Sequence, residues 1–166
     1  ICACLVGSEM CIRDRDKPED ELYKGRISYL LGENKDAISY LEKAKEHKQM
    51  LASYYLGLAY DANGDSDKAK KCIAEYIKSG VATSYDLYEL GMQEMQDGNY
   101  KNALTYFNSG LELEKVPNKQ NLMKSAIAAY EYSGDFDSAK KMMKEYLKAY
   151  PDDEEAKHEN TFLETR

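Results

Sequence analysis

One short pattern recurs four times along the chain: a glycine, four mostly polar residues and an alanine. The glycines that open the blocks are Gly32, Gly64, Gly98 and Gly134, which puts successive blocks 32, 34 and 36 residues apart. Three blocks have a second glycine seven residues upstream, at Gly25, Gly57 and Gly91, whereas the fourth has Ile127 there. Self-similarity at a period near 34 residues predicts an array of like units, each packed on its neighbours.

Each block predicts a helix, a turn and a second helix. The glycine can adopt φ > 0 and end the first helix, and the Asp or Asn that follows it in three blocks can cap the second. In every second helix, small and large residues recur at i, i+4 and i+7 and so share one face. These stripes are Ala37/Leu41/Ala44, Ala69/Ile73/Tyr76, Ala103/Phe107/Gly110 and Ala139/Met143/Tyr146. All three prolines, Pro18, Pro117 and Pro151, lie at unit boundaries, where they interrupt no predicted helix.

The middle two blocks carry the residues of a known repeat. They read Leu56-Gly57, Tyr60, Gly64-Asp65, Ala69, Ile73 and Tyr76, and then Leu90-Gly91, Gly98, Ala103 and Phe107. In period and residue type the chain resembles the tetratricopeptide repeat over about residues 18–151. The resemblance implies an all-α fold, a right-handed α-solenoid of about four helix-turn-helix units. There are three departures: no Trp or other aromatic residue starts the first helices in the family's usual place, Ile127 replaces a glycine, and only the fourth unit closes with a proline. Helical-hairpin repeats of the Sel1 type are the alternative for the 32- and 36-residue spacings.

The predicted array covers residues 16–151, with units at about 18–47, 50–79, 84–115 and 120–150. Residues 152–166 are expected to form a last helix, capped by Asp152 or Asp153, with Ala156, Phe162 and Leu163 as its apolar contacts. Repeat arrays need a terminal element with a polar outer face, so we interpret this helix as a C-terminal cap. A truncated fifth unit is the alternative.

Residues 1–15 differ abruptly from the rest, because they are apolar, Cys-rich and hold two of the chain's four Arg. The stretch Cys4–Asp14 resembles the translation of a transposase-type sequencing adapter, so residues 1–15 are interpreted as a non-native extension. A lipobox-like Ile1–Cys4 after a signal peptide, or an ordinary N-terminal extension, is the alternative. On the adapter interpretation the native N-terminus is missing. After Asp16 the chain has 19 Lys and 2 Arg, a bias that suits an AT-rich bacterial genome.

The 166-residue chain is acidic, with 30 Asp and Glu against 23 Lys and Arg and a net charge of −7. Nucleic-acid affinity rests on many Lys and Arg contacts with phosphates, so this balance argues against a nucleic-acid partner. No apolar stretch approaches the roughly 18 residues of a transmembrane helix, so no membrane contact by this segment is expected. Beyond residue 15 the only cysteine is Cys72, and a lone cysteine is more often a small buried hydrophobe than a ligand.

No arrangement of residues in the sequence points to catalysis. His47 and His158 stand outside any paired or His-Glu-x-x-His arrangement and are expected to be solvated. The acidic groups Asp65/Asp67, Asp135/Asp137 and Asp152–Glu155 look superficially like calcium ligands, but they fit helix capping better. We therefore expect no enzyme activity, no cofactor and no bound metal.

The resemblance implies a concave groove, lined by the first helices of the units, that binds peptides or protein segments. Its candidate residues occupy corresponding positions of the four first helices: Leu22, Arg26, Tyr29, Tyr54, Leu58, Asp61, Tyr88, Met92, Met95, Lys124, Glu131 and Tyr132. The family's carboxylate clamp uses Lys and Asn at successive turns of the first helices, and this pattern is absent, so an acidic chaperone tail is not expected as the ligand. The matching places hold Leu22/Arg26, Tyr54/Leu58, Tyr88/Met92 and Lys124/Ala128. The opposing interpretation is that these Tyr and Met side chains pack between hairpins, as Tyr60, Tyr76, Tyr130 and Tyr146 are expected to do.

The sequence thus predicts a non-catalytic scaffold for a protein or peptide partner whose identity it does not specify. The alternative is a sensing or dimerising segment of a larger regulator or envelope lipoprotein. The sequence leaves the compartment, cytoplasmic or exported, and the oligomeric state undetermined. Replacing Tyr54 and Tyr88 together with Ala is expected to weaken partner binding and to leave helicity largely intact, whereas unfolding of that variant would assign both side chains to the core.

Overall fold

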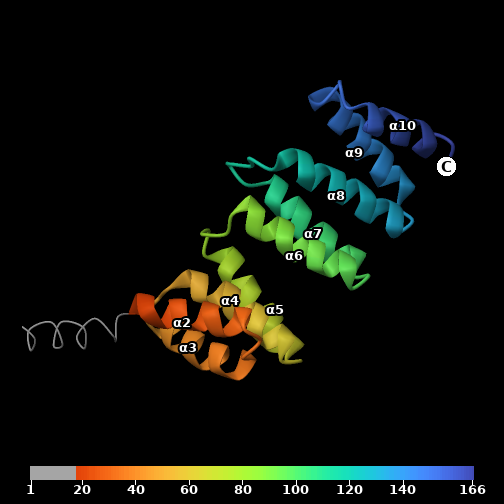
Figure 1. The fold of residues 1–166 in the computed structure, drawn as a ribbon. Helices are drawn as coiled ribbons and strands as arrows, with labels where there is room; N and C mark the ends of the chain where they lie inside the picture. The colour runs from red at the N-terminus through yellow and green to blue at the C-terminus, as the bar shows by residue number, and fades with distance from the viewer. Residues whose placement is uncertain (1–17) are drawn as a thin grey trace, which may run out of the picture. The chain divides into compact units, whose positions relative to one another are not determined.

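The computed structural model describes residues 18–166, and every regular element in this part of the chain is an α-helix (Figure 1). The helices are α2 (Pro18–Leu30), α3 (Asn34–Glu46), α4 (Met50–Ala62), α5 (Ser66–Lys78), α6 (Ser84–Gln96), α7 (Tyr100–Leu111), α8 (Lys119–Tyr132), α9 (Phe136–Ala149) and α10 (Glu154–Leu163). The predicted fold class, an all-α array of helix-turn-helix repeats, is confirmed. Residues 1–15, interpreted above as a non-native extension, lie outside the described residues.

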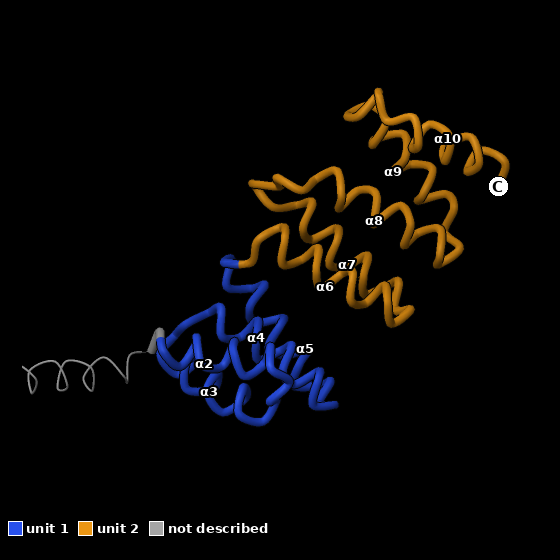
Figure 2. The backbone as a smooth tube through the Cα atoms, viewed as in Figure 1, with its two compact units in different colours: residues 1–81 blue, residues 82–166 orange. Residues whose placement is uncertain are grey.

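The chain divides into two compact units, residues 1–81 and residues 82–166 (Figure 2). The described part of the first unit holds the hairpins α2–α3 and α4–α5, and the second holds α6–α7, α8–α9 and the closing helix α10. Inside each unit, every helix packs on the next along the chain, and the first helices of neighbouring hairpins, α2 with α4 and α6 with α8, also touch. The sequence had suggested one array over residues 16–151.

The turn inside each hairpin is built as the repeat predicts. Its four glycines have φ values of 78°, 86°, 75° and 80° at residues 32, 64, 98 and 134. At the second turn, the Gly64 N–H donates to the Asp61 carbonyl at 2.9 Å and the Asp65 N–H donates to the Tyr60 carbonyl at 2.8 Å. The same pair of bonds closes the other three turns, which makes each a Schellman motif. The predicted helix ends at these glycines are confirmed.

The predicted side-chain caps form at only one of the three places expected. Asp135 accepts a hydrogen bond from the Ser138 N–H at 3.1 Å. Neither Asp65 nor Asn99 makes such a bond, so the prediction is wrong for both. The Asp65 carboxylate lies instead beside Asn63 Nδ2 at 3.3 Å and Lys68 Nζ at 3.9 Å, which compete with the helix for its oxygens.

The second glycine of the first three hairpins marks a close helix contact. A Cβ placed on Gly25, Gly57 or Gly91 would lie 2.5, 2.5 or 2.3 Å from a side-chain atom of Leu41, Ile73 or Phe107 respectively. In the fourth hairpin the corresponding pair is Ile127 and Met143, which are 4% and 3% exposed. The fourth hairpin therefore fills this contact from both helices, and a flexible Met takes the place of a Leu, Ile or Phe.

The core follows the predicted stripes of the second helices. All twelve stripe residues are buried, among them Leu41, Tyr76, Phe107 and Tyr146 at 1% exposure or less. Cys72 is buried in the cluster that contains Leu41, and burial raises the pKa of its thiol. Cys72 is therefore a core residue, as predicted.

The outer face of α2 is apolar and exposed. Tyr23, Ile27 and Leu30 are spaced along one side of this helix and are 65%, 52% and 77% exposed. The residues of α4 and α8 that correspond to Ile27 in the repeat are Ala59 and Ala129, and both are fully buried. The side chain at this repeat position is therefore buried in the hairpins α4–α5 and α8–α9 and exposed in the hairpin α2–α3.

Helix α10 closes the second unit by packing on α9. Ala156 and Leu163 are buried, as expected. Phe162 was also expected to be an apolar contact, but it is 42% exposed, because it directly precedes the buried Leu163 and so lies about 100° around the helix from it. The Arg166 guanidinium lies over the Phe162 ring, 4.9 Å from its centroid. No helix between residues 18 and 166 is long and apolar enough to cross a membrane.

Candidate functional site

Three of the predicted groove residues gather in the first unit around Tyr55, which the sequence reading did not single out. The Arg26 guanidinium lies 4.8 Å from the Tyr55 ring centroid, and the Tyr29 and Tyr54 rings lie 6.5 and 5.1 Å from it. Tyr54 also packs on the buried ring of Tyr76 at 5.3 Å. These side chains form an Arg and Tyr cluster on α2 and α4 that is supported from below by the core.

The remaining candidates of the first unit sit beside this cluster. Leu22 and Leu58 are half-buried, and Leu22 packs against the core. Asp61 is exposed at the end of α4. Burial, and then the negative charge of Asp61, raises the pKa of the Tyr29 hydroxyl, which therefore stays protonated at neutral pH.

In the second unit, the three candidates on α6 are half-buried and pack within the helical stack. Tyr88, Met92 and Met95 contact the cluster that contains Phe107, and the Tyr88 ring lies 6.2 Å from the Phe107 ring. The Ser125 hydroxyl on α8 donates to Met92 Sδ at 3.6 Å. A large part of each of these three side chains therefore serves packing.

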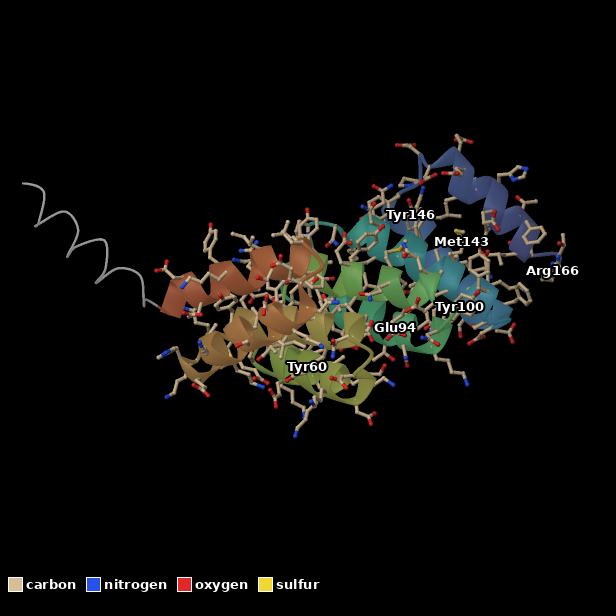
Figure 3. All side chains as sticks on the ribbon, turned by 60° about the horizontal axis from the view of Figure 1, so that its bottom comes forward. Tyr60, Glu94, Tyr100, Met143, Tyr146 and Arg166 are labelled. Atoms are coloured by element: carbon tan, nitrogen blue, oxygen red, sulfur yellow. The ribbon has the colours of Figure 1, made fainter. Side chains whose placement is uncertain are left out.

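Tyr132 stands apart from the other candidates. It is 68% exposed at the end of α8 and stacks on Tyr100 of α7, with ring centroids 5.4 Å apart and an interplanar angle of 16°. The two rings line a shallow hollow at the turns, together with residues 98, 99, 101, 102 and 133. Tyr100 is labelled in Figure 3.

Lys124 and Glu131 line a cleft between α8, α9 and α10. The cleft has a volume of about 310 Å³. Its other lining residues are Ile127 and Ala128 of α8, Met143 and Tyr146 of α9, and Glu155, Ala156 and Glu159 of α10. Ile127, Ala128, Met143 and Ala156 give it an apolar floor, and charged side chains stand at its rim. We call this feature the α8–α10 cleft.

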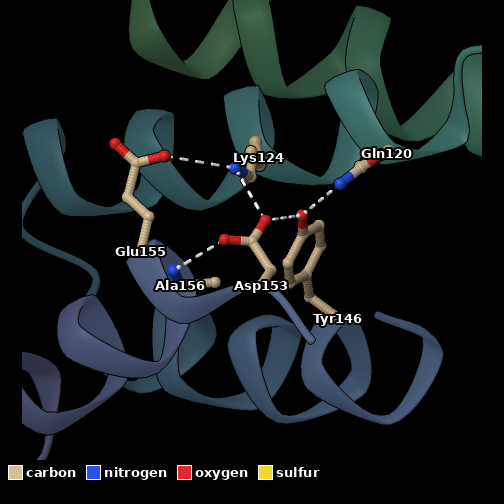
Figure 4. A network of polar contacts seen from close by, with 6 residues as sticks. All are labelled: Gln120, Lys124, Tyr146, Asp153, Glu155 and Ala156. Carbon is tan, nitrogen blue, oxygen red and sulfur yellow. Dashed lines mark hydrogen bonds and ion pairs between the residues drawn. The ribbon is translucent and has the colours of Figure 1, made fainter. Parts of the chain in front are cut away.

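A polar network holds one end of the α8–α10 cleft (Figure 4). Lys124 Nζ lies 2.8 Å from Asp153 Oδ2 and 3.4 Å from Glu155 Oε2. The Tyr146 hydroxyl donates to Asp153 Oδ2 at 2.5 Å and accepts from Gln120 Nε2 at 2.9 Å. The other carboxylate oxygen, Asp153 Oδ1, accepts from the Ala156 N–H at 3.0 Å and caps α10. Asp153 thus ties α8, α9 and α10 together.

The charges in this network reinforce one another. Hydrogen bonds from Lys124, Tyr146 and the Ala156 N–H hold the pKa of Asp153 well below its usual range. The hydrogen bond with Asp153 raises the pKa of Lys124. At neutral pH the carboxylate and the ammonium are therefore both charged and satisfy each other.

The opposite end of the cleft holds an uncompensated carboxylate. Glu131 Oε1 is buried and has no hydrogen-bond partner among residues 18–166. Burial raises the pKa of Glu131, and the nearby charge of Glu159 raises it further. Glu159 joins the cleft from α10. Two carboxylates thus face this end without a partner cation in the described chain.

The sequence reading found only the α8 part of this cleft. The sequence predicts Met143 and Tyr146 as part of the core stripe, Glu155 as one of the capping carboxylates, and residues 152–166 as a cap with a polar outer face. The one sequence signal for this cleft is the departure from the repeat at Ile127. Ile127 and Met143 form part of the cleft floor, at the place where the other hairpins have a glycine against a larger residue. Both histidines are exposed, and no group of His, Cys, Asp and Glu within residues 18–166 is arranged to hold a metal ion.

Comparisons with known proteins agree with this architecture. A family model described as tetratricopeptide repeat matches residues 51–79 and 120–153. A crystal structure of the MamA protein is 24% identical, with 82% of this chain and 74% of that chain covered and a TM-score of 0.62. A crystal structure of YrrB, described as "a TPR protein with an unusual peptide-binding site", is 17% identical, with 94% and 80% covered and a TM-score of 0.62. No curated protein matches the sequence. The four Schellman-closed hairpins, the family match over two stretches of the chain and these structural neighbours support the identification of its repeats as tetratricopeptide repeats.

Proposed function

We propose that the chain is a non-catalytic scaffold that binds a peptide or protein segment in the α8–α10 cleft. The observation that carries this proposal is the cleft itself: a hollow of about 310 Å³ with an apolar floor and a charged rim, framed by three helices. Its size is at the low end for ligand pockets, which suits one or two inserted side chains better than a whole cofactor. The peptide-binding site named for YrrB supports the same use of this fold.

The side chains of the cleft suit binding rather than catalysis. Its lining contains no Ser, Thr, Cys or His, so it offers none of the usual nucleophiles and no imidazole base. Lys124 is held in ion pairs with Asp153 and Glu155, which keeps it protonated. A raised pKa such as that of Glu131 is found in catalytic acids, but also in a binding carboxylate that has no cationic partner until its ligand binds.

Several narrower expectations belong to this proposal. The ligand is not an acidic chaperone tail, because the clamp pattern of Lys and Asn is absent and the cleft rim is itself acidic. A nucleic-acid partner is disfavoured by the same charge. A role within a larger regulator or envelope lipoprotein is compatible with peptide binding, and the compartment does not affect the test below.

The proposal is tested by filling the cleft. A phage-displayed library of random peptides is selected on the wild-type chain and on Ala128→Trp, which places an indole over the floor. Ala74→Trp on the exposed face of α5 is the matched control. We expect the wild-type chain and Ala74→Trp to enrich the same peptides and Ala128→Trp to lose them with its circular dichroism unchanged. Equal enrichment by a folded Ala128→Trp chain would refute the cleft as the binding site.

A further inference from the structure

We propose that the α8–α10 cleft selects segments that carry a basic side chain, with its cation placed between Glu131 and Glu159. This inference rests on the proposed function and adds the chemical class of the ligand. It concerns the end of the cleft away from the Lys124 and Asp153 network.

The first argument is the balance of charge in the cleft. Three carboxylates and one ammonium line it. The ammonium of Lys124 is already neutralised by Asp153 at 2.8 Å and Glu155 at 3.4 Å. In the described chain, no ion pair joins Glu131 or Glu159 to a cation. The remaining charge, that of Glu131 and Glu159, is negative and lies at the end of the cleft away from Lys124.

The second argument is the buried acceptor of Glu131. A buried carboxylate oxygen without a hydrogen bond costs free energy, because it has given up water and gained nothing in exchange. A ligand N–H would satisfy this oxygen, and a positive charge would offset the repulsion between Glu131 and Glu159. An acidic ligand group would add a third negative charge at the same place.

The third argument is the floor between the charged ends. Lys and Arg have long apolar stems that lie along hydrophobic surface while their charged heads reach a polar partner. Ile127, Ala128 and Met143 supply such a surface next to Glu131. A charged hydrogen bond of this kind is worth a factor of about ten to a hundred in affinity.

The test compares charge-removing variants at equal net charge. The random peptide library is selected on the wild-type chain, on Glu131→Gln/Glu159→Gln, and on Glu145→Gln/Glu164→Gln, whose side chains are exposed outside the cleft. We expect the wild-type chain and the Glu145/Glu164 variant to enrich Lys or Arg at one fixed position. The Glu131/Glu159 variant is expected to lose this preference and to bind a selected basic peptide about tenfold or more weakly.

The outcomes separate the two proposals. Enrichment of peptides without a basic residue, or a basic preference that survives Glu131→Gln/Glu159→Gln, overturns the inference while peptide binding in the cleft stands. A preference lost equally in the Glu145/Glu164 variant also overturns it, because long-range charge would then explain the effect. If the wild-type chain enriches nothing beyond Ala128→Trp, the proposed function fails and the inference fails with it.

Discussion

Gly91→Ala tests the helix packing directly, because it adds one methyl group where the structure has no room. A Cβ on residue 91 would lie 2.3, 2.6 and 2.8 Å from Cε1, Cδ1 and Cζ of Phe107. Phe107 is fully buried, so its ring has no path to solvent. The substitution gains about 1 kcal/mol of helix propensity, and the overlap costs about 3 kcal/mol, the upper end for an added methylene. We expect a net destabilisation of about 2 kcal/mol.

Urea unfolding followed by far-UV circular dichroism measures this difference. Phe107→Leu completes a double-mutant cycle: alone it leaves a cavity, but beside Ala at residue 91 it also relieves the overlap. We expect the two substitutions to be coupled by at least about 1 kcal/mol. Both residues lie in the second unit, so one transition reports on them.

Gly98→Ala is the matched control in the same unit. Gly98 has φ of 75°, and nothing lies within 4 Å of an added Cβ. Its cost of about 1–2 kcal/mol therefore comes from backbone strain alone, with no coupling to Phe107. The reasoning is refuted if Gly91→Ala stabilises the chain by about 1 kcal/mol, the gain in helix propensity alone, and shows no coupling with Phe107→Leu.

Three further substitutions have expected outcomes in the same unfolding assay. Lys48→Gly should stabilise the chain by about 1 kcal/mol, because Lys48 has φ of 60° where a glycine is unstrained; no gain would contradict this. Ile27→Gln should change stability by less than about 0.5 kcal/mol, because Ile27 is 52% exposed, whereas Ala59→Gln, at the corresponding buried position, should cost more than about 2 kcal/mol. Glu131→Gln should stabilise the chain at neutral pH, because the pKa of Glu131 is raised and its charged form disfavours folding. That gain should shrink as pH falls and vanish below about pH 4, where the carboxyl is protonated in both states; a gain that is constant with pH would contradict it.

The fold could be predicted from the sequence because each repeat contains a residue that marks where its first helix ends. A glycine that ends a helix needs φ > 0, and its position fixes the end of the first helix and the start of the second. Gly64 shows this, with φ of 86° and both Schellman bonds in place. The side-chain caps were less predictable, because an Asp such as Asp65 has several hydrogen-bond partners within reach and the sequence does not rank them.

The candidate site was predicted in part, for a reason of geometry. Register along the first helices identified Lys124 and Glu131, which do line the α8–α10 cleft. Tyr132, one residue past the register position of Glu131, was also predicted in the groove, but it lies one turn beyond Ala128 at the end of α8 and meets Tyr100 there. A register rule treats every first helix alike, so it has no way to find a cleft that exists only where a hairpin meets a closing helix.

The departure from the repeat and the proposed site coincide in the fourth hairpin. Where the other hairpins pair a glycine with a larger residue, this one pairs Ile127 with Met143, and both side chains reach the cleft floor. Two apolar side chains there widen the surface on which a ligand stem is able to lie, and Asp153 fixes α10 so that Glu159 is held opposite Glu131. Stability alone does not account for this arrangement, because the buried Glu131 oxygen has no partner and its charge opposes folding. A carboxylate that costs stability in the free chain and gains a partner on binding is the pattern expected of a binding residue.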